Sequence, residues 1–167
     1  MFSEIKTKIE LLAPKKLVGC KIRTSLTNNK TFQVWQNFMA RKDEILHKVN
    51  SSFISLQEYD PLYFLEYNVE NVFYKWAAIE VSRYENIPEG MEPIDLPGGL
   101  YAVFDYKGQS TDANIYQYVF TSWLPHSYYK LDDRLHIEIL KVSDKNEVPE
   151  SGDEIWVPIK HRLLVGM

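Results

Sequence analysis

The chain of 167 residues contains 19 Lys and Arg against 23 Asp and Glu, for a formal net charge of −4, and 45% of its residues are hydrophobic. This length suits one domain with a hydrophobic core, and the negative balance disfavours direct binding to nucleic acid phosphates. A single Cys20 excludes an intramolecular disulfide, the charged N-terminus is unlike a signal peptide, and no apolar run approaches the roughly 20 residues of a membrane helix. We therefore expect a cytoplasmic protein without a membrane association.

Alternating apolar residues predict strands along most of the chain. The predicted strands are 4–12, 16–25, 53–58, 72–83, 100–106, 135–142 and 154–159. Two segments, 31–49 and 111–123, instead place their apolar residues at helical spacing. The second helix is expected to begin at Ser110 or Thr111 and to end before Pro125.

The two halves of this pattern match each other at a constant separation of 83 residues. The matched pairs are Leu17 with Leu100, Trp35 with Tyr118, Ile54 with Ile137, and Val72 with Ile155. Each half reads strand, strand, helix, strand, strand, and such a unit has more apolar sheet surface than one helix can cover. We therefore predict one domain over residues 1–167, built from halves at about 4–83 and 87–164, with a cavity at the seam between them.

Two segments lie outside the repeated pattern. Residues 60–71 form an insertion-like link between strands of the first half. Residues 84–99 join the halves and hold three of the eight prolines, which indicates an ordered turn region rather than a flexible linker.

Motifs of metal and cofactor sites are missing from the sequence. There is no glycine-rich phosphate loop, no cysteine pair, and no His-x-x-x-His or His-Glu-x-x-His spacing. Four scattered histidines do not predict a metal site, and Cys20 inside an apolar strand is typical of a buried structural thiol. We predict no metal and no cofactor.

Aromatic residues supply the strongest remaining signal, since they make up 14% of the chain and include 11 Tyr and 4 Trp. Those on or beside elements expected to face the seam are Trp35, Tyr67, Tyr74, Trp76, Tyr101, Tyr116, Trp123 and Trp156. An ordinary aromatic core explains any single one equally well. Because a buried tyrosine hydroxyl needs a partner, however, a tyrosine-rich interior is often partly hydrated.

The stretch "RLHIEILKV" (134–142) places a carboxylate in the middle of a predicted strand. Its isoleucines share one face, and Glu138 lies on the other, between His136 and Leu140. An exposed strand face is the simplest explanation. The matching position in the first half is Ser55, so the repeated fold itself does not require the carboxylate.

The same region carries a family resemblance. The stretches "YAVFDYKG", "IYQYVFTSWLPHSYYKLDDRLHIEILK" and "DEIWVPIK" resemble the second half of the GyrI-like, or AraC-type, effector-binding domains. The shared features are a strand ending in glycine, a helix ending in Trp-Leu-Pro, a short acidic turn, a strand bearing one glutamate, and a final strand. The resemblance covers about residues 72–160 and reaches the first half only through the repeat.

The resemblance implies an α+β fold of two βαββ units, an SH2-like pseudo-repeat, packed around a central cleft for small organic molecules. In drug-sensing members the strand glutamate faces this cleft and meets cationic, aromatic ligands. By position, Glu138 matches that glutamate and Trp123 the tryptophan of the helix end. The further ligand-binding candidates are Tyr74, Trp76, Tyr101, Tyr67, Tyr116 and Trp35. No helix-turn-helix region precedes the domain, so we expect a stand-alone member of the family.

A carboxylate among aromatic rings suits a lipophilic cation. Burial without a partner raises a carboxyl pKa by up to a few units, a ligand cation restores a partner, and each aromatic face adds about 0.5–2 kcal/mol. We therefore predict a binding protein for a cationic or aromatic small molecule rather than an enzyme. The resemblance to the effector-binding domains further implies a link to transcription regulation or to toxin and drug resistance.

Two alternatives stay open. The first is a hydrolase that uses Glu138 as a general base beside a tyrosine hydroxyl. The second is a protein-interaction module resembling a gyrase inhibitor, with the acidic segment 144–154 as its surface. An enclosed aromatic pocket at Glu138 favours binding or catalysis, whereas a filled seam favours the interaction module.

Overall fold

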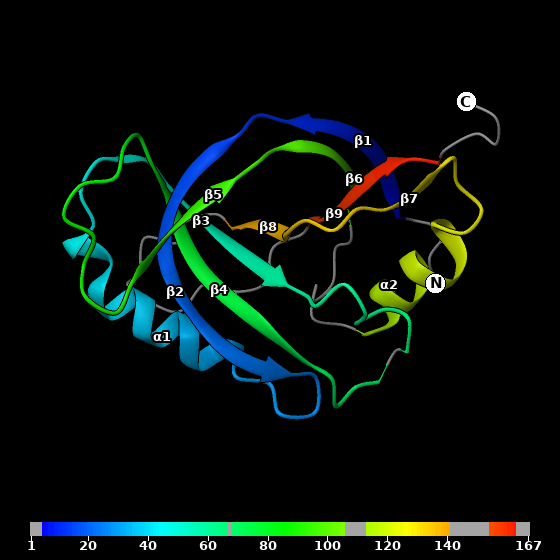
Figure 1. Ribbon diagram of the computed structural model, residues 1–167, viewed down its shortest axis with the longest axis horizontal. Helices are drawn as coiled ribbons and strands as arrows, with labels where there is room; N and C mark the ends of the chain where they lie inside the picture. Colours follow the sequence, from blue (N-terminus) through cyan, green and yellow to red (C-terminus); the bar gives the residue numbers. More distant parts are fainter. Residues whose placement is uncertain (1–4, 67, 106–112, 141–153, 163–167) are drawn as a thin grey trace.

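In the computed structural model most of the chain forms one curved antiparallel sheet with two helices packed on it (Figure 1). The structure describes residues 5–66, 68–105, 113–140 and 154–162. The strand order is β1 (Lys6–Leu12), β6 (Gly99–Asp105), β9 (Glu154–His161), β8 (His136–Leu140), β3 (Lys48–Glu58), β4 (Val72–Val81), β2 (Lys15–Ser25) and β5 (Glu92–Leu96), and β7 (Tyr129–Leu131) pairs with β9. The predicted α+β class is confirmed.

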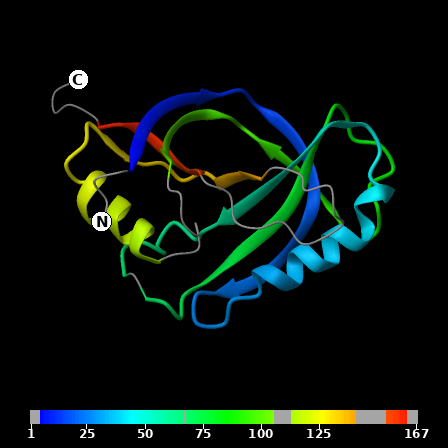
Figure 2. The ribbon, with the colours of Figure 1, turned by 180° about the vertical axis from the view of Figure 1, so that it is seen from behind.

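Both helices lie on one face of the sheet, towards its opposite ends (Figures 1 and 2). Helix α1 (Thr31–Arg41) is followed by a 3₁₀ turn at Lys42–Glu44, and α2 (Ala113–Tyr118) continues as a π-helix at Val119–Trp123. Each helix covers a separate apolar cluster. The α1 cluster includes Val18, Val34, Trp35, Phe38, Phe53, Ile79 and Leu140, and the α2 cluster includes Ala102, Phe104, Ile115, Val119, Ile155 and Val157.

The first helix is shorter than the predicted 31–49. It ends at Arg41, after which Ile45 is extended and His47 has a φ of 64°, so the chain turns into β3. The residues from Lys48 onward belong to β3, which pairs with β4. Val49 is therefore exposed on a strand and does not belong to the apolar face of the helix. The second helix matches the predicted 111–123 from residue 113 onward, and its expected cap residues lie outside the described residues.

The region 84–99 contains a strand that the sequence pattern did not predict. Strand β5 pairs only with β2 at the end of the sheet, where Pro93 does not interrupt a second ladder. Pairing with β2 makes this segment extended, and its buried Ile94 and Leu96 alternate with exposed Pro93 and Asp95. The short β7 was likewise not predicted.

The opposite face of the sheet curves over an inner core. That core includes Leu12, Leu17, Ile54, Leu56, Trp76, Ala78, Leu96, Tyr101 and Ile137. Strands β3 and β8 pair at the centre of the sheet. If β1, β2, β3 and β4 are matched with β5, β6, β8 and β9 in turn, the strand order is the same from both ends of the sheet. This order is what two packed copies would produce, and the internal duplication stays a prediction.

Candidate ligand-binding site

Buried polar side chains gather on the helix-covered face of the central strands β4, β3 and β8. Ser55 pairs with Glu138 on one side and Ala77 on the other, and the next pairs on this face join Gln57 to His136 and to Lys75. Each of these polar residues is at most 5% exposed. We call the set the polar row: Ser55, Gln57, Lys75, His136 and Glu138.

The polar row lies between the two helix-covered clusters. The cross-strand pair of Phe53 and Leu140, next to Ser55 and Glu138, belongs to the α1 cluster. On the other side, Tyr116 of α2 reaches the row and packs against the α2 cluster. This face of the sheet is therefore polar at its centre and apolar on both sides.

A chain of hydrogen bonds joins Gln57, Tyr116 and Glu138. The Gln57 amide Nε2 donates to the Tyr116 hydroxyl at 3.1 Å, and this hydroxyl donates to Glu138 Oε1 at 3.2 Å. Burial, and then the charge of Glu138, raise the pKa of Tyr116 well above its usual 10. The hydroxyl thus stays protonated and donates a hydrogen bond to the carboxylate. A tyrosine hydroxyl within hydrogen-bond distance of Glu138 is also one requirement of the hydrolase alternative.

Lys75 places a second buried charge in the row. Burial lowers the pKa of Lys75, and the negative charge of Glu138 acts in the opposite direction. The sequence predicted that Glu138 meets a cation only when a ligand binds. This prediction is incomplete, because Lys75 already interacts electrostatically with Glu138.

His136 is a neutral, ring-packed member of the row. Burial, together with the charge of Arg134, lowers the pKa of His136 to about 3. Its ring meets the Tyr59 ring edge-on at 4.8 Å and stacks on Phe64 at 5.7 Å. The imidazole is uncharged near neutral pH and adds to the aromatic surroundings.

Aromatic side chains from the link between β3 and β4 cover this end of the row. Figures 1 and 2 show the link reaching towards α2, and the Phe64 ring lies 4.4 Å from Phe120 of the π-helix. The Tyr59 ring lies 5.0 Å from Phe73 of β4. We call the set the aromatic cover: Tyr59, Tyr63, Phe64, Phe73 and Phe120. The insertion-like link predicted at 60–71 thus contributes to the site.

A groove of about 470 Å³ opens beside the aromatic cover. It is lined by Arg23, Glu58, Tyr59, Asp60, Pro61, Val72, Phe73 and Tyr74. Tyr59 and Phe73 belong to both the groove and the cover. Its volume is in the range of small-molecule sites, and its lining includes two residues of the aromatic cover but none of the polar row.

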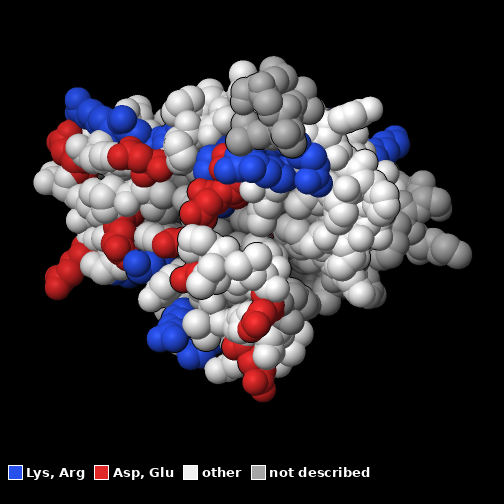
Figure 3. Space-filling view, turned by 45° about the vertical axis from the view of Figure 1, so that its right-hand side comes forward, with Lys and Arg blue, Asp and Glu red and all other residues white. Residues whose placement is uncertain are grey.

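The charged surface is mixed. On the face in Figure 3, Lys and Arg lie among Asp and Glu, and a broad area beside them carries no charge. Ion pairs such as Lys8 with Glu154 at 3.7 Å and Arg83 with Glu85 at 3.0 Å join opposite charges. This face does not present a concentrated positive field.

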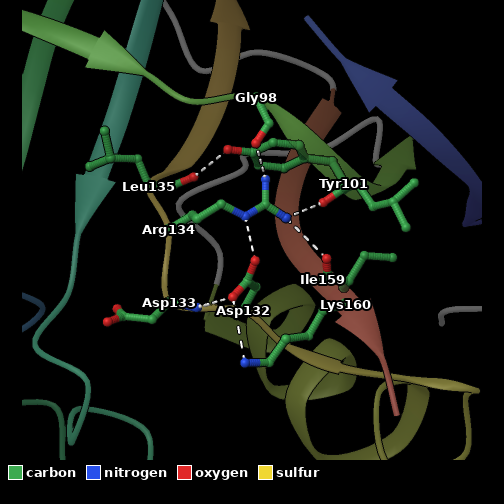
Figure 4. A network of polar contacts seen from close by, with 9 residues as sticks. Gly98, Tyr101, Asp132, Asp133, Arg134, Leu135, Ile159 and Lys160 are labelled. Atoms are coloured by element: carbon green, nitrogen blue, oxygen red, sulfur yellow. Dashed lines mark hydrogen bonds and ion pairs between the residues drawn. The ribbon is translucent and has the colours of Figure 1, made fainter. Parts of the chain in front are cut away.

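Arg134 anchors the start of β8, which carries His136 and Glu138 (Figure 4). Its guanidinium donates to Asp132 at 2.6 Å and lies 4.8 Å from the centre of the Tyr101 ring. It also donates to the carbonyls of Gly98 at 2.7 Å, Leu100 at 2.6 Å and Ile159 at 3.0 Å. These bonds join the β8 turn to β6 and β9, and thereby position the row.

Comparison with known families decides the assignment. The model of the integron-associated effector binding protein family, Cass2, matches residues 8–159. The chain belongs to this family. It is a small-molecule effector-binding domain of the GyrI-like fold, as the resemblance implied, and the match favours this function over the hydrolase and interaction-module alternatives.

Solved structures agree on the fold. A structure of SAV2435 bound to tetraphenylphosphonium has a TM-score of 0.62 at 17% identity, over 93% of this chain and 94% of that one. The integron cassette protein VCH_CASS2 from the mobile metagenome of Vibrio cholerae has a TM-score of 0.59 at 12% identity, over 95% and 100%. The EcmrR C-terminal domain has a TM-score of 0.68 at 11% identity, over 95% and 99%. No curated protein sequence matches significantly.

The predicted ligand residues lie in different parts of the fold. Of the predicted residues, the structure brings Glu138 and Tyr116 into direct contact. Trp35 and Trp123 lie on the same face but inside the flanking clusters, where Trp35 packs on Phe53 and Trp123 on Phe104. Tyr67 lies outside the described residues.

Three predicted wall residues lie on the opposite face of the sheet from Glu138. Because Ala77 shares the face of Ser55 and Glu138, Tyr74 and Trp76 project the other way. Trp76 donates to Glu58 at 3.0 Å, and Tyr74 borders the groove. Tyr101 is completely buried in the inner core and donates to the Leu135 carbonyl at 2.8 Å. These three do not wall the carboxylate.

Sequence reasoning missed most of the polar row and the aromatic cover. His136 could have been found, because it lies two residues from Glu138 and so shares its face. Ser55, Gln57 and Lys75 join the row only through strand pairing.

Among the described residues, no group of three or more His, Cys, Asp or Glu could hold a metal ion. In the same part of the chain, no helix is long and apolar enough to cross a membrane.

Proposed function

We propose that the protein binds a cationic, aromatic small molecule at the polar row, with Glu138 as the charged anchor. The observation that carries this proposal is the burial of the Glu138 carboxylate, 3% exposed, at the centre of the sheet between the two helix-covered clusters. Burying a carboxylate costs folding free energy, so a fold that keeps one at its centre is a candidate functional site.

The surroundings of the carboxylate suit such a ligand. The aromatic cover offers ring faces and edges beside the row, and cation–π attraction adds to the pull of Glu138. The groove at Tyr59 and Phe73 provides the approach. When the ligand binds, its aromatic part displaces aromatic rings of the β3–β4 link. Tyr63 and Phe64 lie in a turn of this link rather than in a strand, so no strand pairing holds them in place.

The solved structure of a protein with the same fold supports a cationic ligand. SAV2435 was solved with tetraphenylphosphonium, which is a lipophilic cation, and EcmrR was solved in a complex with DNA. We extend the first property to this chain on the basis of Glu138, and we infer that the bound molecule acts as a signal in regulation or resistance.

Tetraphenylphosphonium and tetraphenylborate test the proposal, because they have nearly the same shape and opposite charge. Calorimetry should show binding of the cation and at least tenfold weaker binding of the anion. Glu138→Gln keeps the side-chain shape and should weaken the cation about tenfold or more, since a charged hydrogen-bond or ion partner is worth about 1.5–3 kcal/mol. Glu89→Gln, at an exposed site, is the matched control. Equal binding of the cation by the Glu138→Gln variant would refute the proposal.

A further inference from the structure

We propose that the ligand of this site carries N–H donors, so that the polar row takes a protonated amine, amidine or guanidine in preference to a fully substituted cation. This inference rests on the proposed function and narrows the class of cation. It follows from side-chain atoms in the row that have no hydrogen-bond partner among the described residues.

In the part of the chain that the structure describes, three buried polar atoms of the row lack a hydrogen bond. They are Ser55 Oγ, Gln57 Oε1 and His136 Nδ1. Folded proteins leave few buried polar atoms unpaired, and here three lie on neighbouring strands beside a buried carboxylate. Such a cluster is better explained by a missing partner than by three independent defects.

The hydrogen-bond chain determines which atom of Gln57 is unpaired. An ionised Glu138 can only accept, so the single hydrogen of the Tyr116 hydroxyl points at Glu138 Oε1. That hydroxyl must then accept its other bond from Gln57, and only the amide nitrogen can donate it. The Gln57 carbonyl oxygen therefore faces away from Tyr116 and is an acceptor without a donor.

Register places these acceptors around one position. Ser55 is directly opposite Glu138, and Gln57 is the next residue on the same face of β3. Opposite residues of antiparallel strands have Cβ atoms about 4.5–5.5 Å apart. An ammonium or amidinium group has several donors and can address the carboxylate, the Ser55 hydroxyl and the Gln57 carbonyl together.

A fully substituted cation supplies charge without donors. It would place a positive charge near Glu138 but would donate no hydrogen bond to the buried Ser55 hydroxyl or the buried Gln57 carbonyl. Sites built to hydrogen-bond a ligand group discriminate strongly against analogues that lack it. The row should therefore prefer the N–H cation even where both cations fit the aromatic cover.

The test compares 2-naphthylmethylammonium with its N,N,N-trimethyl derivative by calorimetry near neutral pH, since both carry one positive charge and the same ring. The parent should bind 2-naphthylmethylammonium about tenfold more tightly than the trimethyl derivative, because hydrogen bonds from a charged donor contribute about this much to affinity. Gln57→Leu should remove most of this preference by weakening the ammonium alone. Gln36→Leu, at an exposed position of α1, should change neither affinity. Ser55→Ala repeats the test if the Gln57 variant fails to fold.

The outcomes separate this inference from the proposed function. Equal affinity of the parent for the two naphthyl cations, or an unchanged preference in the Gln57→Leu and Ser55→Ala variants, overturns the inference and leaves a cation site. Binding of tetraphenylphosphonium without binding of either naphthyl cation also overturns it. Failure of every cation to bind overturns both.

Discussion

The Tyr116 hydroxyl lies 3.2 Å from Glu138 Oε1 and donates to it, which ties the second helix to the centre of the sheet. The same hydroxyl accepts from Gln57, so one tyrosine joins α2 to both β3 and β8. The contact couples the helix that borders the site to the carboxylate that anchors the proposed ligand.

Tyr116→Phe removes the hydroxyl and keeps the ring. The change leaves the Gln57 amide without its acceptor and takes one donor from a buried carboxylate, so the free energy of unfolding should fall by about 1–3 kcal/mol. Urea denaturation measures this loss. Tyr128→Phe, at a residue 87% exposed, should change stability by less than about 0.5 kcal/mol. A Tyr116→Phe variant as stable as the parent would show that the hydrogen-bond chain is not formed.

Lys75→Met removes the second buried charge. The cost of burying the ammonium exceeds its attraction to Glu138, so the variant should be more stable near neutral pH by on the order of 1 kcal/mol. The pKa of Lys75 is lower in the folded state, so the unfolded chain binds more protons in the alkaline range and the parent gains stability as pH rises towards about 10.4. Lys75→Met should lack this gain.

The same variant should bind tetraphenylphosphonium several-fold more tightly, because a competing positive charge is gone. Calorimetry and denaturation at two pH values check both effects. Lys48→Met, at an exposed position of β3, serves as the control. Weaker cation binding by Lys75→Met would mean that the lysine helps to hold the ligand.

His136 should make the protein sensitive to acid. The pKa of His136 is about 3 in the folded protein and about 6.5 in the unfolded chain, so the unfolded chain binds more protons between these values. The stabilising contribution is complete above the unfolded value and is lost as pH falls towards the folded value. At 1.36 kcal/mol per pKa unit, the loss is about 3 kcal/mol between about pH 7.5 and pH 4.5.

His136→Phe keeps a ring in the aromatic cover and cannot titrate. Denaturation across this range should show a flatter pH dependence for His136→Phe than for the parent, and an unaltered one for His126→Phe at an exposed site. Parallel pH profiles of the parent and His136→Phe would contradict the assignment of a neutral, buried imidazole.

Arg134→Lys tests the network that positions β8. A lysine keeps the charge but cannot reach Asp132 and three carbonyls at once, so buried acceptors lose their donors. Unfolding free energy should fall by about 3 kcal/mol or more, and cation affinity should fall with it because Glu138 shifts. Arg83→Lys, at an exposed side chain, is the control. Unchanged stability of Arg134→Lys would show that the network is dispensable.

Local patterns in the sequence were enough to predict several features. The period of two in most strands and the helical spacing at 31–41 and 113–123 established the α+β class, because these periods follow from backbone geometry. Alternation around Glu138 separated it from its isoleucine neighbours, and the Trp-Leu-Pro context led to the effector-binding family, which the match over residues 8–159 confirmed.

The composition of the site was decided by tertiary structure. Alternation assigns faces within one strand, but only the register between strands says which faces coincide, and a slip of one residue reverses them. For this reason Tyr74, Trp76 and Tyr101 were expected beside Glu138 and lie on the other face. Pairing of β3 with β4 and β8 brought Gln57 and Lys75 into the row, and packing of the β3–β4 link against the π-helix placed rings over it, which no local pattern encodes.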